Sequence, residues 1–138
     1  MIDHMSLPIT DIARSRAFYD AVLAPLGYAR VMDEDHAEYV ASGYGPDGGD
    51  HPEPTFWIGA GVGDDLSVPR LPDGFHLAFA APDRATVDAF HAAALAAGGQ
   101  DNGAPGLRHD YHPNYYAAFV IDPDGVHIEA VCHTPTGG

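Results

Sequence analysis

The chain contains two copies of one segment. Shifting the sequence by 72 residues places residues 4–27 on residues 76–99 with nine identities and no gap. His4 coincides with His76, and Asp11 coincides with Asp83. A duplicated segment builds two structurally similar halves, so equivalent positions of the copies can converge on one site. The shared histidine near the start of each copy is therefore the first candidate for such a site.

The composition excludes several classes of function. The net charge is −14, all six basic side chains are scattered arginines, and lysine is absent. Nucleic-acid binding needs a basic face, so we expect no nucleic-acid partner. Without lysine, the chain cannot use a Schiff-base mechanism. No apolar run approaches the roughly 18 residues of a membrane span, so we expect no membrane partner.

Cys132 is the single cysteine, so no internal disulfide can form, which fits a reducing compartment. Asp3 and His4 directly follow the first two residues, and this charged start does not predict a signal peptide. We therefore expect a cytoplasmic protein.

Residue periodicity predicts one helix and four strands in the first copy. Over residues 2–9, alternation places Leu7 and Ile9 on one side and His4 on the other. Asp11 is a typical N-cap of a helix that should run to about Leu26. The further expected features are a helix stop at Gly27, strands near 28–34, 37–42 and 55–60, and a loop from Gly43 to Pro54.

The same pattern restarts after an expected linker over residues 61–73. His76 lies in an alternating strand, and Asp83 should cap a helix that ends at Gly98 and Gly99. The further expected strands are 100–104, 115–121 and 126–132, with a tight turn over Asp122–Gly125. The sequence thus predicts an α+β fold of two βαβββ modules, residues 1–60 and 74–133, with mixed sheets covered on one side by helices.

His4, His76 and Glu129 are the candidate metal ligands. Each is expected in the middle of a strand, on the side away from the helix. A carboxylate in a half-apolar strand is costly to bury unless it is paired or bound to a metal. Two imidazoles and one carboxylate suit Fe, Mn, Zn or Ni and leave positions open for a substrate. The residues alone leave open the alternative that these are ordinary strand histidines.

Residues 106–116, GLRHDYHPNYY, form a second cluster before the penultimate strand. It is either a substrate-facing loop, in which His112 acts as a general acid or base, or a surface loop with aromatic packing. The residues that we expect to bind substrate are Tyr39, Trp57, Arg108, Tyr111 and Tyr116.

Three segments, HMSLPITDIARSRAFYDAVLAPLGY, FHLAFAAPDRATVDAFHAAALAAGG and FVIDPDGVHIEAV, resemble the vicinal oxygen chelate superfamily. That superfamily includes glyoxalase I, extradiol dioxygenases, fosfomycin-resistance enzymes and bleomycin-binding proteins. The resemblance implies a cupped sheet around one divalent metal held by His4, His76 and Glu129. It also implies a homodimer, in which His4 can come from one subunit and the other two ligands from its partner.

Glyoxalase I has a fourth ligand, a glutamate on the last strand of the first module. Here the 72-residue shift places Trp57 opposite Glu129, and the nearby Glu53 lies beside prolines in an expected loop. This difference argues against ordinary glyoxalase chemistry, and the acidic chain offers little of the cationic pocket that fosfomycin needs. The resemblance then implies a dioxygenase or a lyase/isomerase that grips a small substrate through two oxygens. The alternative is a metal-free binding protein of the bleomycin-resistance type, with Trp57 and tyrosines as the walls of its pocket.

Overall fold

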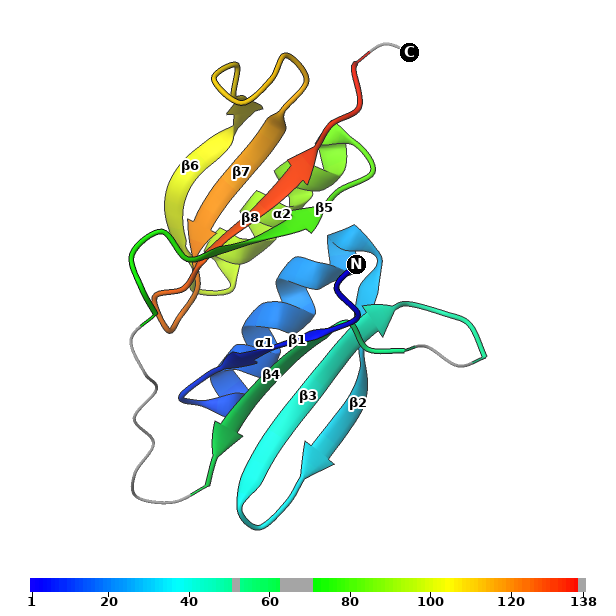
Figure 1. The fold of residues 1–138 in the computed structure, drawn as a ribbon, viewed down its shortest axis with the longest axis vertical. Helices are drawn as coiled ribbons and strands as arrows, with labels where there is room; N and C mark the ends of the chain where they lie inside the picture. The colour runs from blue at the N-terminus through cyan, green and yellow to red at the C-terminus, as the bar shows by residue number, and fades with distance from the viewer. Residues whose placement is uncertain (51–52, 63–70, 137–138) are drawn as a thin grey trace. The chain divides into compact units, whose positions relative to one another are not determined.

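A computed structural model describes residues 1–50, 53–62 and 71–136 (Figure 1). The chain divides into two compact units, Met1–Arg70 and Leu71–Gly138. Each unit contains a helix and a four-stranded mixed sheet, so the predicted α+β class with two βαβββ modules is confirmed. Residues 63–70, the larger part of the expected linker 61–73, lie outside the described residues. Within the described ranges, no helix is long and apolar enough to cross a membrane.

Unit 1 has the strand order β1-β4-β3-β2. Strands β1 and β4 are parallel, and the other neighbours are antiparallel. Helix α1 packs on β2, β3 and β4, and its predicted N-cap is confirmed because the Asp11 carboxylate accepts a hydrogen bond from the backbone N–H of Arg14. The elements are β1 (Met5–Pro8), α1 (Ile12–Leu23), the short 3₁₀ helix η1 (Ala24–Leu26), β2 (Tyr28–Asp35), β3 (Tyr39–Pro46) and β4 (Phe56–Gly61).

Unit 2 repeats this arrangement in the order β5-β8-β7-β6, again with one parallel pair, β5 and β8. Helix α2 packs on β6, β7 and β8, and Asp83 caps it through the backbone N–H of Thr86. The predicted tight turn before β8 is present, with Gly125 at a positive φ of 87°. The elements are β5 (His76–Ala80), α2 (Arg84–Ala96), β6 (Gln100–Leu107), β7 (Tyr116–Ile121) and β8 (His127–Cys132).

The strand register repeats as closely as the strand order. In the parallel pair of unit 1, Ser6 is opposite Trp57; in that of unit 2, Ala78 is opposite Glu129. The 72-residue shift of the sequence relates Ser6 to Ala78 and Trp57 to Glu129. The prediction that Trp57 stands at the position of Glu129 is therefore confirmed by the backbone register.

Each helix covers the apolar face of its own sheet. In unit 1, Leu7, Phe18 and Ile58 are at most 1% exposed, and in unit 2 Phe90 and Ile128 are equally buried. The alternation predicted around the shared histidines is confirmed, since Leu7 is buried whereas His4 and His76 are exposed. The core therefore lies between helix and sheet, and the histidines lie on the side away from it.

Two local expectations were wrong. Gly43 does not begin a loop, because β3 continues to Pro46 and pairs with both neighbouring strands. A Cβ at Gly43 would come within 2.7 Å of the Pro54 side chain and 3.0 Å of the Trp57 ring, so glycine allows this close packing. The histidines also do not lie in mid-strand: His4 precedes β1, and His76 is the first residue of β5.

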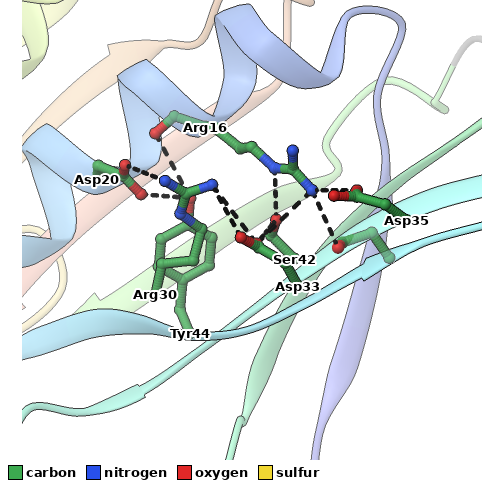
Figure 2. A network of polar contacts seen from close by, with 8 residues as sticks. Arg16, Asp20, Arg30, Asp33, Asp35, Ser42 and Tyr44 are labelled. Atoms are coloured by element: carbon green, nitrogen blue, oxygen red, sulfur yellow. Dashed lines mark hydrogen bonds and ion pairs between the residues drawn. The ribbon is translucent and has the colours of Figure 1, made fainter.

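A polar network joins α1 to β2 and β3 (Figure 2). The Arg16 side chain is 19% exposed and donates to Asp35 at 2.7 Å and to the buried Ser42 hydroxyl at 2.7 Å. Ser42 in turn donates to Asp33 at 2.6 Å. The bond to Asp35 is the largest cause that raises the pKa of Arg16. The network therefore fixes the helix on the polar part of the sheet beside the apolar core.

Replacing Arg16 by methionine is expected to lower the free energy of unfolding of unit 1 by about 1–2 kcal/mol. Stability would fall because the carboxylates of Asp33 and Asp35 would no longer pair with the Arg16 guanidinium. Chemical denaturation followed by circular dichroism measures it. Ala13→Met is the control, because it places the same new side chain at an exposed position of the same helix and should change stability by less than about 0.5 kcal/mol. Equal losses for the two variants would contradict the assigned role of the network.

Candidate functional site

A cavity of about 710 Å³ opens on the sheet of unit 2. Two predicted metal ligands line it, His76 from β5 and Glu129 from β8. The two strands are parallel neighbours, and Ala78, two residues after His76, is the register partner of Glu129. The other lining residues are Gly74, Phe75, Asn102, Asp110, Tyr111, His112, Tyr115, Phe119, His127 and Ile128.

Glu129 is a buried carboxylate on the cavity side of β8. It is 2% exposed, and its β8 neighbours Ile128 and Ala130 are equally buried. The Tyr115 hydroxyl donates a hydrogen bond to Glu129 Oε1 at 2.8 Å. Burial and this bond raise the pKa of Tyr115 to about 12, so the phenol stays protonated and remains a donor at neutral pH.

The hydrogen bond of His76 fixes its tautomer. Nδ1 lies 3.0 Å from the backbone carbonyl oxygen of Gly74. A carbonyl oxygen can only accept, so Nδ1 carries the hydrogen and the neutral ring has its lone pair on Nε2. Metal-binding histidines commonly have this arrangement, because a bond at the second nitrogen orients the ring and raises its basicity.

His4 has the same arrangement in unit 1. Its Nδ1 lies 2.6 Å from Asp3 Oδ1, and since a carboxylate accepts, the lone pair of the neutral ring is again on Nε2. His4 lines a cavity of about 730 Å³ in this unit. The histidines that the sequence repeat makes equivalent thus share one tautomer, each held by an oxygen on the Nδ1 side.

His112 also lines the unit 2 cavity, but both of its ring nitrogens are engaged. Nδ1 accepts from the backbone N–H of Asn114 at 3.0 Å, so Nε2 carries the hydrogen and donates to His133 Nδ1 at 2.6 Å. Acid–base work by His112 would require one of these bonds to open. In this conformation the ring links the turn before β7 to the segment after β8.

The residues predicted to bind substrate fall into two groups. Tyr39 and Trp57 line the unit 1 cavity, and Tyr111 lines the unit 2 cavity. Arg108 lies over the Phe119 ring at 5.1 Å and donates to the Ala104 carbonyl. Tyr116 donates to Asp88 of α2, under the Arg84 guanidinium. Arg108 and Tyr116 are not among the residues that line either cavity.

From the cluster at residues 106–116, sequence reasoning chose Tyr116 and not Tyr115 as a site residue. Phe119 is the register partner of Glu129, and the residues on the same face of β7 are found by counting back in steps of two. That count reaches Ala117 and then Tyr115, whereas Tyr116 falls on the helix side. The period of two would therefore have chosen Tyr115 over Tyr116 for the face that bears Glu129.

Two side chains that line the unit 2 cavity, His76 and Glu129, are of the types that bind a divalent metal. A buried carboxylate with a free charge is costly, and a cation beside it would offset that cost. His76 offers a neutral imidazole nitrogen on the neighbouring strand, and imidazole with carboxylate suits Fe, Mn, Zn and Ni. Among the described residues, no three His, Cys, Asp or Glu side chains gather as a metal-binding group. The predicted set takes its third member, His4, from unit 1.

Comparison with known proteins gives one consistent result. The profile of the Glyoxalase/Bleomycin resistance protein/Dioxygenase superfamily matches residues 1–130. The fold is similar to a glyoxalase/bleomycin resistance protein from Albidiferax ferrireducens T118, with a TM-score of 0.69 and 28% identity over 94% of this chain and 96% of that one.

Two further solved structures share the fold at lower identity. A glyoxylase/bleomycin resistance protein/dioxygenase domain from Frankia sp. EAN1pec has a TM-score of 0.69 and 17% identity over 94% of each chain. A glyoxalase I mutant from Zea mays has a TM-score of 0.69 and 22% identity, covering 94% of this chain and 46% of that one. No curated protein matches the sequence. Because the superfamily profile spans nearly the whole sequence, the chain belongs to the Glyoxalase/Bleomycin resistance protein/Dioxygenase superfamily.

Proposed function

We propose that this protein is a divalent-metal-dependent enzyme that binds a small substrate through two oxygens. His76 and Glu129 would hold the metal from unit 2, and His4 would complete the set, either from the same chain or from a second copy in a homodimer. The observation that carries the proposal is that His76, in the tautomer with its lone pair on Nε2, lines the cavity that contains the buried Glu129.

When bound, the metal would supply positive charge at two neighbouring substrate oxygens, and three protein ligands would leave room for both. The protein groups divide the remaining work. Glu129 supplies the only full negative charge among the three ligands. Tyr111 and Tyr115 contact each other edge to face at 4.8 Å beside the cavity, and they would exclude water and pack against the substrate. Dioxygenase and lyase/isomerase reactions both fit this division.

The first experiment measures the metal content of protein purified without a metal-affinity tag. We expect one divalent ion per chain after incubation with Fe, Mn, Zn or Ni, and loss of that ion in His76→Ala. The loaded protein is then screened against diols, catechols, 2-oxo-aldehyde–thiol adducts and fosfomycin. His91→Ala is the control, because His91 bonds to Asp101 through Nε2 and lies outside both cavities. A wild-type protein that binds none of the four metals would overturn the proposal.

One observation favours a second function, metal-free binding of a small molecule. Trp57 stands where unit 2 has Glu129, so the parallel strand pair of unit 1 presents an indole in place of a carboxylate. Trp57, Tyr39 and Met32 line part of the unit 1 cavity and supply aromatic and apolar surface there. Ligand-induced quenching of the single tryptophan, unchanged by removal of metal with a chelator, would support this function over the enzyme.

A further inference from the structure

The hydrogen bond between Tyr115 and Glu129 gives the tyrosine a specific task at this site. It occupies one oxygen of the carboxylate, Oε1, at 2.8 Å. A carboxylate that is free to rotate can bind a metal through one oxygen or through both. The hydrogen bond from the phenol engages a lone pair of Oε1. The second carboxylate oxygen, which accepts no such bond from the phenol, is then the better metal ligand.

The Tyr115 backbone is fixed by the turn in which it lies. Its carbonyl accepts from the backbone N–H of Arg108 at 2.7 Å, and its own N–H donates to the His112 carbonyl at 3.2 Å. These bonds close the connection between β6 and β7 directly beside the last register pair, Leu107 with Tyr116. The Cα of Tyr115 is therefore held by the end of the sheet.

Three other rings fix the Tyr115 ring. Tyr111, His112 and His133 meet it edge to face, with centroid distances of 4.8, 5.4 and 5.2 Å and interplanar angles of 71, 80 and 81°. His112 and His133 are themselves joined at 2.6 Å, so they cannot move independently. The residue between Tyr115 and Phe119 on this face is Ala117, which is small and fully buried.

We propose that Tyr115 is the positioning residue of Glu129, holding Oε1 so that the carboxylate binds the metal through its other oxygen alone. This inference rests on the proposed function. It assigns His112 and His133 a supporting task, since they hold the ring that holds the carboxylate. Binding through one oxygen also keeps a coordination position open, which a substrate that binds through two oxygens requires.

The test compares Tyr115→Phe with wild type by using Co²⁺ as the probe. Removing the hydroxyl is expected to weaken Co²⁺ binding by about 10–100-fold, measured by competition with a chromophoric chelator. The visible absorption bands of bound Co²⁺ should also change in position and intensity, because a carboxylate that binds through both oxygens raises the coordination number. A merely structural role of the ring would not change these bands.

Tyr116→Phe is the matched control. It removes the same atom from the adjacent residue, where the hydroxyl bonds to Asp88 on the helix side, and it should leave affinity and spectrum unchanged. Circular dichroism of the metal-free variants verifies the fold, which should survive the loss of one oxygen atom. If Tyr115→Phe is folded and binds Co²⁺ with the affinity and spectrum of wild type, the inference is wrong and the proposed function stands. If wild type binds no Co²⁺ or any other divalent ion, both are wrong.

Discussion

Replacing Glu129 by glutamine is expected to weaken divalent-metal binding by at least about 100-fold. Mutation of a residue that only orients a metal ligand commonly lowers metal affinity by about 10–100-fold. Loss of the charged ligand itself should lower the affinity at least as much. Glutamine keeps the size of the side chain and can still accept the hydrogen bond of Tyr115. Because Glu129 is 2% exposed, the change also removes a buried charge. The metal-free variant should therefore be as stable as the metal-free wild type, or more stable.

Thermal unfolding with and without metal measures this effect. A metal that binds only the folded chain raises the melting temperature of wild type, and this rise should disappear in Glu129→Gln. Glu53→Gln is the control, because Glu53 is a carboxylate that lines the unit 1 cavity and is not a predicted ligand. Equal metal affinity in wild type and Glu129→Gln would remove Glu129 from the ligand set.

The second large effect is expected from two equivalent substitutions, Phe18→Ala and Phe90→Ala. The two positions are related by the 72-residue shift, and both side chains are 0% exposed. Each substitution should lower the free energy of unfolding of its unit by about 3–5 kcal/mol, because it removes a buried ring and leaves a cavity. Small domains have only about 5–15 kcal/mol of stability, so either loss is a large part of the total.

Urea denaturation followed by circular dichroism gives the two values. Leu95→Ala is the control: Leu95 lies on the same helix as Phe90 but is 42% exposed, and its truncation should cost less than about 1 kcal/mol. A cost below about 1 kcal/mol for only one of Phe18→Ala and Phe90→Ala would show that the copies do not use this position in the same way.

The features that the sequence predicted well are local ones. Asp11 and Asp83 cap their helices through bonds three residues away, and the turn before β8 depends on Gly125 and its immediate neighbours. Such interactions depend on a few adjacent residues, so composition and spacing reveal them. The repeat also predicted a non-local feature. It aligned Trp57 with Glu129, and the two residues do occupy equivalent register positions in the two sheets.

The features that the sequence did not predict depend on tertiary contacts. Gly43–Pro46 has the composition of a loop, yet it lies in a strand because β2 and β4 pair with it on both sides. Tyr115 and Glu129 are 14 residues apart, and their hydrogen bond depends on the pairing of β7 with β8. Arg108 was predicted to bind substrate as part of the cluster at residues 106–116, whereas its guanidinium is engaged by Phe119 and a backbone carbonyl. Periodicity gives the face of a strand but not the partner of a side chain.

The parallel pairs place the first strand of each unit beside its last one. Met5 of β1 pairs with Phe56 of β4, and His76 of β5 pairs with His127 of β8. During synthesis, β1 must therefore wait for about fifty further residues before its partner leaves the ribosome, and β5 waits equally long. Contacts this distant in sequence close slowly, so each half is expected to reach its final sheet only when its whole length has been translated. The first half is then expected to fold while the second is still being synthesised, so that the two copies would fold one after the other.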